Sequence, residues 1–333
     1  MSREQSYDHR QLTAGVDDNG RRIDRVVRRA VPQLGLSQLH RALRVGEIRR
    51  NGKRCRASDR VENGDIITVR LPRSAGSAID TAAVTRHPAP ETLIEGRIIL
   101  ENEHILALHK RRGTLVHGDG SLNDAVTRYL SDRLKPSLSF RPGPLHRLDR
   151  NSSGLILFGK SLQGAQRFSE LLQQRQVAKS YLGLFAGAIR QPCCWSGSIQ
   201  RNQRTLRSHS GSSGYSAETV VQPLALGRYD DGQVLTLAIC RIRSGRTHQI
   251  RAHAAHAGFP LAGDSKYGGG SFLGGYILHA LSIELERVDP LLGFRRLVDP
   301  PENSVQQRIE RFFGRSALHA VVQEQPKRLH YGP

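Results

Sequence analysis

A stretch without hydrophobic periodicity divides this chain into two folding units of very different size. From Leu71 to about Pro90 the sequence is rich in Ala, Ser, Pro and Thr, which is the composition of a linker between domains. The length of 333 residues also predicts two domains, because a single hydrophobic core rarely grows beyond about 250 residues. We predict an arm over residues 1–20, a small module over 21–71, a linker over 72–92, a large domain over 93–302 and a basic tail over 303–333.

The small module is predicted to hold two short helices followed by a small sheet. Apolar residues recur at helical spacing in the first helix, and Ser37 is the expected N-cap of a second helix that ends at Gly46. The pair Asn51-Gly52 suits a tight hairpin, and residues 66–69 have the composition of a strand. The polar arm that precedes the module is expected to be mobile or to form an edge segment.

The large domain is predicted to mix strands and helices. Apolar runs predict strands at residues 105–108, 155–158, 181–185 and 234–239, and an apolar stripe at helical spacing predicts a helix over 162–172 that Ser161 caps. The chain as a whole is therefore expected to be an α+β protein.

The charge of the chain points to nucleic acid as a partner. Lys and Arg number 50 against 30 Asp and Glu, a net charge of +20, and only seven of the 50 are Lys. Arginine matches phosphate oxygens with a planar fork of donors and stacks on bases. Between Arg21 and Arg70 alone, fourteen basic residues face five acidic ones. The alternatives are a merely solvated charged face, or an anionic membrane surface, which would need a basic amphipathic helix with large apolar anchors that the sequence lacks.

The cysteines and the hydropathy exclude other classes of protein. Four cysteines form no Cys-x-x-Cys pair, so neither a disulfide scaffold nor a cysteine zinc site is indicated. No apolar run approaches the roughly 18 residues that a membrane span needs. We expect a cytoplasmic protein with reduced thiols and no membrane partner.

The densest polar cluster is His-Arg-Leu-Asp-Arg-Asn-Ser-Ser-Gly, residues 146–154, directly before an apolar strand. Asp149 lies between Arg147 and Arg150, and a carboxylate held there at the mouth of a cleft could act as a base or a nucleophile. The alternative from the residues alone is a structural Asp that caps a turn, because Asn-Ser-Ser-Gly is ordinary turn chemistry.

A second polar cluster, Ser-Gly-Arg-Thr-His-Gln-Ile-Arg from residue 244, opens a predicted helix with Thr247 as N-cap. His248 and Arg251 are three residues apart and share a helix face. A metal site made of His248, His253 and His256 is the alternative, but their spacings of five and three differ from a His-Glu-x-x-His helix. We expect no metal.

The order of these motifs resembles the RluA-type pseudouridine synthases over nearly the whole chain. The resemblance is carried by residues 146–154, Lys179-Ser180-Tyr181, 245–251, 263–268 and Leu278-His279-Ala280. It implies a large domain with a mixed, mainly antiparallel sheet flanked by helices. Two positions depart from the family pattern. Arg111-Arg112 follow Lys110 where Pro and a small residue are usual, which leaves the shape of that loop open, and Ser152 replaces the usual Thr.

The small module resembles the RNA-binding module first known from ribosomal protein S-four. This second resemblance implies that the module docks on folded RNA through its helices. Arg25, Arg41 and Arg44 are the helix positions expected to meet phosphate, with Lys53 on the hairpin.

The family resemblance implies a chemistry and a role for each site residue. Uridine becomes pseudouridine when the bond from ribose to nitrogen 1 breaks and the sugar rejoins carbon 5, which requires base flipping but no cofactor. Asp149 would be the catalytic carboxylate, as nucleophile at the ribose or as base at its carbon 2, and Arg251 would hold its charge. Tyr181 would stack on the flipped base and relay a proton, with Leu278 packed against it. RNA would contact Arg147, Arg150, Arg246 and His248.

The expected substrate is structured RNA of the large ribosomal subunit, and the expected state is a monomer. Two other functions stay open from the sequence. A non-catalytic RNA-binding factor would use the basic module and treat Asp149 as structural. An RNA N-glycosylase or nuclease would need a second carboxylate or a metal set, and none accompanies Asp149 in the sequence.

Overall fold

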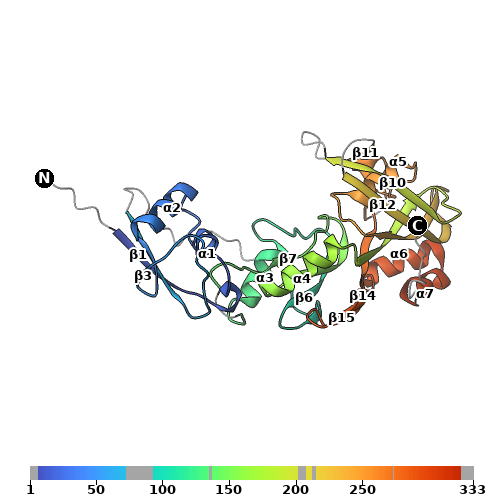
Figure 1. Cartoon of the computed structure of the whole chain (residues 1–333). Helices are drawn as coiled ribbons and strands as arrows, with labels where there is room; N and C mark the ends of the chain where they lie inside the picture. Colours follow the sequence, from blue (N-terminus) through green and yellow to red (C-terminus); the bar gives the residue numbers. More distant parts are fainter. Residues whose placement is uncertain are drawn as a thin grey trace.

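The fold was analysed in a computed structural model that describes residues 7–72, 93–134, 137–201, 208–211, 215–272 and 274–323. The predicted linker lies outside these residues except for Pro72, which ends a strand, and so do positions 1–6 and 324–333 of the predicted arm and tail. Figure 1 shows the small module at one end of the molecule and the last helices at the other.

The small module pairs two helices with a four-stranded antiparallel sheet. Its elements are β1 (Tyr7–Thr13), the short helix η1 (Val16–Asp18), α1 (Ile23–Ala30), α2 (Leu36–Val45), β2 (Ile48–Arg50), β3 (Lys53–Arg54) and β4 (Ile66–Pro72), with the sheet order β1-β4-β2-β3. Apolar residues of both helices and the sheet form one buried cluster. The two predicted helices and the predicted strand are confirmed. Helix α2 ends as predicted at Gly46, which adopts a left-handed conformation with φ of 78°.

One of the two alternatives for the arm is confirmed, and the predicted N-cap of α2 needs correction. Residues 7–13 of the predicted arm form the edge strand β1, and Ala14 is buried in the module core, so the described part of the arm is an edge segment of the sheet. Strand propensity there is low, and pairing with β4 provides the backbone hydrogen bonds instead. The N-cap of α2 is Gly35, not Ser37, because the helix begins one residue before the predicted cap.

The large domain is built on a mixed sheet whose strands are antiparallel with a single exception among the described residues. Its strands are β5 (Ile98–Glu101), β6 (Ile105–Lys110), β7 (Gly143–Pro144), β8 (Ser153–Gly159), β9 (Val177–Ala186), β10 (Cys193–Arg201), β11 (Ser208–Gly211), β12 (Tyr215–Arg228), β13 (Val234–Ile242), β14 (Leu278–Asp289) and β15 (Phe294–Val298). Their order is β11-β10-β12-β13-β9-β14-β8-β6-β5, with β15 on β14 and β7 on β8. The predicted α+β fold is confirmed.

The exception is the contact between β8 and β14, which run parallel at the centre of the sheet. Gly154 of β8 lies opposite Ala280 of β14, and Ala280 also pairs with Tyr181 of β9. A Cβ atom on Gly154 would collide with the backbone of Ala280, and its φ of 108° favours glycine. This close approach places the start of β8, β9 and β14 side by side.

Helices flank the sheet, as Figure 1 shows. They are α3 (Leu122–Leu130), α4 (Leu162–Gln173), α5 (Gln249–His256), α6 (Asn303–Phe313) and α7 (Arg315–Gln323), with the short helix η3 (Ser265–Tyr267). Ser161 caps α4 as predicted and accepts a hydrogen bond from the Gly164 amide at 3.0 Å. In no helix of the described residues is the apolar stretch long enough to cross a membrane.

Helices α6 and α7 stand where a basic tail was predicted from residue 303. Ile309, Ala317 and Val321 are buried in a cluster with Leu182 and Leu237 of the sheet. The expectation of a tail was wrong for residues 303–323, because the high proportion of Arg and Gln obscured an apolar face that covers the sheet.

Candidate active site

Asp149 lies on the turn that leads into β8, above the centre of the sheet. All seven residues of β8 are buried, so the strand anchors the turn firmly. The Ser152 amide donates to the Asp149 carbonyl at 3.1 Å, which closes the turn. The Asp149 side chain is only 15% exposed and points toward α5.

Arg251 of α5 pairs with Asp149, as the family resemblance implied. Its Nη1 lies 3.0 Å from Oδ2 of Asp149. The Nε and Nη2 atoms of Arg251 donate to the two carboxylate oxygens of Asp264 at 2.7 and 2.8 Å. The guanidinium also lies between the rings of Tyr267 and Tyr276, at 4.9 and 4.8 Å from their centroids. Four neighbours therefore fix the orientation of Arg251.

The charge of Arg251 is maintained in this buried position. Burial alone would lower the pKa of the guanidinium, but the hydrogen bonds to Asp264 and the attraction of nearby acidic groups outweigh it and raise the pKa. Asp264 was not singled out from the sequence as a site residue, because its thirteen-residue separation from Arg251 gives no local signal.

His248 is the N-cap of α5, where Thr247 was predicted, and has a left-handed backbone with φ of 55°. Its Nδ1 lies 2.9 Å from the Tyr267 hydroxyl, and its Nε2 lies 3.8 Å from Oδ1 of Asp149. Burial lowers the pKa of His248 to about 4, although the attraction of Asp149 opposes this shift. The imidazole is therefore neutral near pH 7 and lies beside the carboxylate.

Tyr181 and Leu278 complete the group beside Asp149. Tyr181 is 7% exposed and Leu278 is 6% exposed, and both line the same cavity as the carboxylate. Burial and the charge of Asp149 raise the pKa of the Tyr181 phenol. The phenol therefore keeps its proton near pH 7, so it could relay a proton only by accepting one as it gives another.

The cavity measures about 900 Å³, within the range that holds a small ligand such as a nucleotide. It is lined by Asp149, Tyr181, Arg251 and Leu278, by Arg147, Arg246 and His248, and by Ser169, Leu172 and Gln173 of α4. The four predicted catalytic residues thus meet around one space. Of the four large-domain residues predicted to contact RNA, Arg147, Arg246 and His248 line it, and Arg150 does not.

Lys179 is a lining residue to which sequence reasoning gave no role. It is 4% exposed, and burial lowers the pKa of its ammonium to about 8. No carboxylate of the described residues lies within ion-pair distance of it. Gly245 leaves room for this ammonium, because a Cβ there would come within 2.8 Å of Nζ. A cation without an acidic partner in a cavity can meet a phosphate or carbonyl oxygen of a ligand.

Lys110 fixes the turn that carries Asp149 from below. It is completely buried, and its ammonium donates to the carbonyl oxygens of Arg111, Thr114 and Arg150 at 3.0 to 3.1 Å. Burial lowers the pKa of Lys110 to about 8, against the attraction of Asp149. Arg150 also donates from Nε to the Gly113 carbonyl at 3.1 Å, so its side chain braces the same loop.

The unusual Arg111-Arg112 pair has separate uses in this loop. Arg112 donates to the Tyr276 carbonyl at 2.6 Å, and its guanidinium lies 5.4 Å from the centroid of the Tyr276 ring. Arg111 is largely exposed and lies 3.7 Å from Glu302. The shape of the loop, which the sequence left open, is thus set by Arg112 packing against the ring that also contacts Arg251.

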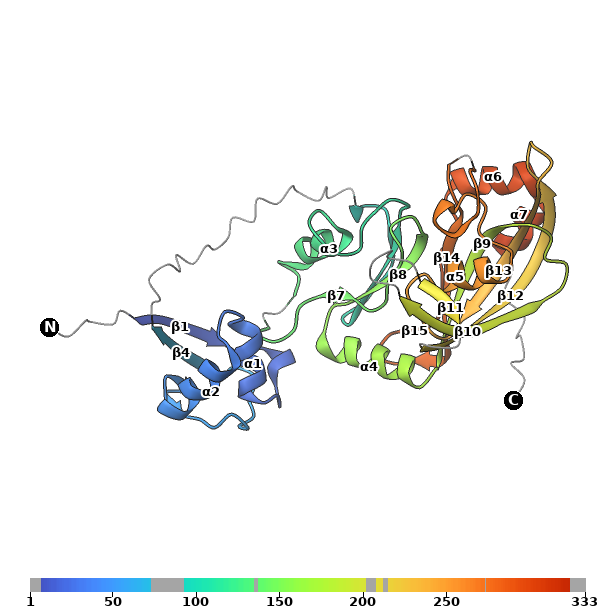
Figure 2. The same ribbon diagram turned by 90° about the horizontal axis from the view of Figure 1, so that it is seen from above.

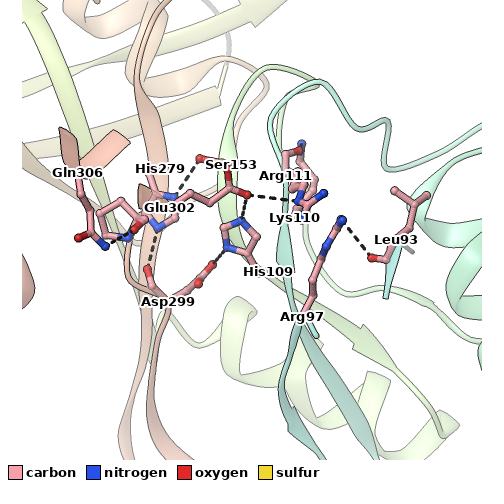
Figure 3. A network of polar contacts seen from close by, with 11 residues as sticks. Leu93, Arg97, His109, Lys110, Arg111, Ser153, His279, Asp299, Glu302 and Gln306 are labelled. Carbon is pink, nitrogen blue, oxygen red and sulfur yellow. Dashed lines mark hydrogen bonds and ion pairs between the residues drawn. The ribbon is translucent and has the colours of Figure 1, made fainter. Parts of the chain in front are cut away.

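A polar network lies beneath Lys110, as Figure 3 shows. His109 lies between Asp299 and Glu302, with both ring nitrogens 2.7 Å from a carboxylate oxygen. His279 lies 2.9 Å from the Ser153 hydroxyl and 2.7 Å from the Asp299 carbonyl. The network joins β6, β8 and β14 to the segment before α6, directly behind the site.

Two of the three histidines weighed as metal ligands have other partners. His253 Nδ1 lies 2.9 Å from the Thr219 hydroxyl, while His248 contacts Tyr267. In the part of the chain that the structure describes, no group of three or more His, Cys, Asp or Glu side chains is arranged to hold a metal ion.

The remaining predicted RNA contacts lie in the small module. Arg25 of α1, Arg41 and Arg44 of α2, and Lys53 of β3 are all exposed. Arg41 and Arg44 are three residues apart and share a face of α2. They do not line the cavity, so the basic residues form two separate groups.

Comparisons with known proteins agree with this geometry. A family model described as RNA pseudouridylate synthase matches residues 104–256, which contain Asp149, Tyr181 and Arg251. The chain is 33% identical over 269 residues to ribosomal large subunit pseudouridine synthase C of Salmonella typhi, covering 78% of this chain and 80% of that protein. The protein of the same name from Haemophilus influenzae is 30% identical over 316 residues, covering 90% and 94%.

A solved structure agrees at the level of the fold. Human RNA pseudouridylate synthase domain containing 4 superposes with a TM-score of 0.51 at 19% identity, covering 71% of this chain and 97% of the human chain. The identity to the bacterial relatives extends over most of both sequences, well beyond the residues of the family model. This chain is therefore a member of the RluA-type family of RNA pseudouridine synthases, which are isomerases.

Proposed function

We propose that this enzyme isomerises specific uridines of large-subunit ribosomal RNA, with Asp149 as its catalytic carboxylate. The observation that carries the proposal is the pairing of Asp149 with an arginine that Asp264 holds by two hydrogen bonds, at the edge of a cavity large enough for a nucleotide. The names of the bacterial relatives supply the class of RNA.

The cavity suits a flipped uridine better than a uridine in a helix. The atoms that react are inaccessible in a stacked base, so the nucleotide must leave the stack, which costs a few kcal/mol. Arg147 and Arg246 at the cavity offer cations to the RNA backbone, and so does the basic module. Contacts with phosphate would offset the cost of unstacking.

Inside the cavity, Asp149 would act on the ribose. As nucleophile it would attack carbon 1 of the sugar and displace uracil, and carbon 5 of the base would later displace the carboxylate. As base it would remove the proton from carbon 2 and return it there when carbon 5 bonds to carbon 1. In both routes the bond to nitrogen 1 breaks, the base turns, and carbon 5 bonds to the sugar while its proton is lost and nitrogen 1 gains one. Tyr181 is positioned to stack on the turning base and to relay that proton.

The acidic groups of the site bear on whether water could take part in the reaction. A glycosidase uses a second carboxylate to activate water, with the two groups about 5 to 9.5 Å apart. Glu218, the other acidic residue that lines the cavity, accepts a hydrogen bond from the Cys194 thiol, and both oxygens of Asp264 accept hydrogen bonds from Arg251. Asp264 is thus occupied in holding a cation, which favours an isomerase over a hydrolase.

The proposal is tested with large-subunit ribosomal RNA that lacks pseudouridine. Wild-type and Asp149→Asn proteins are incubated with it, and products are mapped by carbodiimide-primed stops of reverse transcription. We expect stops at discrete uridines with wild type and none with the variant, a loss of at least roughly 10⁴-fold if the carboxylate is essential. Asp231→Asn, an exposed turn position between β12 and β13, is the matched control and should behave as wild type.

Two results would contradict the proposal. If neither protein produces stops while both bind the RNA, a non-catalytic RNA-binding factor becomes the better description for this substrate. If Asp149→Asn retains the wild-type stops, the enzyme is a synthase but another group performs the chemistry.

A further inference from the structure

Besides the peptide chain, a buried carboxylate joins the small module to the large domain. Asp18, at the end of η1, has no exposed surface. It accepts hydrogen bonds from the amides of Leu138 at 2.8 Å and Ser139 at 2.9 Å, from the Ser137 hydroxyl at 3.4 Å and from the Ser139 hydroxyl. The Gly15 amide of its own turn donates at 2.9 Å. A carboxylate with this many donors is a built contact, since each buried donor would be costly to leave unpaired.

Neighbouring residues extend this contact on both sides. Asp17 accepts a hydrogen bond from the amide of Leu162, the first residue of α4, at 2.9 Å. Arg21 donates from Nη1 to the Ser139 hydroxyl at 2.8 Å. Leu138 packs against the apolar core of the module. We call the contact of Asp17, Asp18 and Arg21 with residues 137–139 and Leu162 the Asp18 joint.

The joint touches the large domain on both sides of the catalytic turn. Residues 137–139 precede Asp149 by ten to twelve positions, and Leu162 follows it after β8. Helix α4 then runs from the joint toward the cavity, and three residues of its far half line that cavity. Twelve helical residues span about 18 Å. Figure 2 shows α4 lying between the module and the far half of the sheet.

The peptide connection could not fix this spacing by itself. Twenty residues separate β4 from the start of the described large domain at Leu93, and a chain of that length can reach roughly 70 Å when extended. The placement of the module relative to the cavity is therefore set by the joint.

We propose that the Asp18 joint determines which uridines are modified, by holding the basic module at a fixed distance from the cavity. An RNA then fits only if its own fold keeps the element bound by the module and the target uridine at the matching separation. The inference rests on the proposed function and deepens it. The substrate class is a folded RNA with two recognition elements, whereas a short stem-loop that carries only the uridine gains nothing from the joint.

The first test measures the joint without any catalysis. Spin labels are placed on the full-length protein at Ser58→Cys in the module and Glu103→Cys between β5 and β6, both exposed, with Cys193→Ser and Cys194→Ser to leave only buried native thiols. Pulsed electron resonance should give one narrow distance distribution. Ser139→Asp, which sets a carboxylate against Asp18 without altering the module, should broaden it. Asp18→Ala should do the same.

Asp8→Ala is the matched control, because Asp8 lies in the same module and its side chain pairs with Arg10 at the sheet edge. It should leave the distance distribution narrow. The proposal is overturned if the labelled protein with an unsubstituted joint gives a broad distance distribution, or if Ser139→Asp gives a narrow one.

The second test measures which uridines the enzyme modifies. On complete large-subunit RNA, Ser139→Asp should lower modification at the uridines that wild type modifies by roughly tenfold, the result of a modest loss of effective concentration. The same variant should add reverse-transcription stops at other uridines. On a stem-loop that carries one target uridine, kcat/KM should equal that of wild type. An unchanged pattern on complete RNA overturns the proposal. If wild type modifies no ribosomal RNA, the proposed function fails, while the distance measurement still decides whether the joint holds the module.

Discussion

At the scale of single residues, the site is organised around one arginine that has a partner on every side. Arg251 contacts Asp149, but its other donors are bound by Asp264 and its faces by two tyrosines. Asp264 is buried and does not line the cavity, so we expect it to affect the reaction only by positioning Arg251.

We expect Asp264→Asn to lower kcat by roughly 10² while KM changes little, because a misplaced cation perturbs the chemistry more than the binding of RNA. The amide would place a donor against a guanidinium that has no acceptor to offer. Single-turnover kinetics on large-subunit ribosomal RNA that lacks pseudouridine measure the effect. Asp264→Glu, which restores the charge, should recover part of the loss. If Asp264→Glu and Asp264→Asn lower kcat equally, and both also lower the melting temperature, then Asp264 only stabilises the fold.

At the scale of elements, the strands behind the site depend on a histidine held by two carboxylates. Burial disfavours the charged ring of His109, but the hydrogen bonds and attraction of Asp299 and Glu302 outweigh it and raise the pKa. A raised pKa means that the folded state binds the proton more tightly than the unfolded state. The stabilisation is therefore complete below the unfolded pKa near 6.5 and is lost as the pH rises through the folded pKa.

We accordingly expect the melting temperature of wild type to fall as the pH rises above about 6.5, in part through His109. His109→Asn should be less stable than wild type at pH 6 by roughly 1.5–3 kcal/mol, the usual contribution of hydrogen bonds to a charged group. The melting temperature of this variant should also fall less than that of wild type as the pH rises. Calorimetry from pH 6 to 9 measures both. His319→Asn, at an exposed position of α7, is the control. If the two variants show the same pH dependence, His109 is not the titrating group.

Elements with a continuous apolar pattern could be predicted from the sequence, and polar elements could not. Strand β8 was evident because its apolar residues form a continuous run, and helix α4 because its apolar residues recur at helical spacing. Helices α6 and α7 were missed, and strand β1 was expected only as one of two alternatives, because each is stabilised by a neighbour distant in sequence. The same limit applies to the site: the motifs gave Asp149 and Arg251, whereas Asp264 became a partner only when the fold closed.

At the scale of the whole molecule, part of the net charge of +20 lies in the small module and part around the cavity of the large domain. Binding of RNA should release counterions, so its affinity should fall linearly with the logarithm of salt concentration. Each phosphate contact that is lost should reduce the slope by about 0.7 to 0.9. The exposed Arg41 and Arg44 of α2 are where we expect two such contacts.

The double substitution Arg41→Gln/Arg44→Gln should therefore reduce the salt slope by about 1.5 and weaken binding of all large-subunit RNA fragments alike. Filter binding between 50 and 200 mM salt measures this. Arg295→Gln/Arg315→Gln removes the same charge from positions far from the module, each paired with a glutamate, and should leave the slope almost unchanged. If both double variants reduce the slope equally, RNA responds to the overall charge and α2 makes no direct contact. A reduction confined to the α2 variant would identify the module as the second point at which RNA is held.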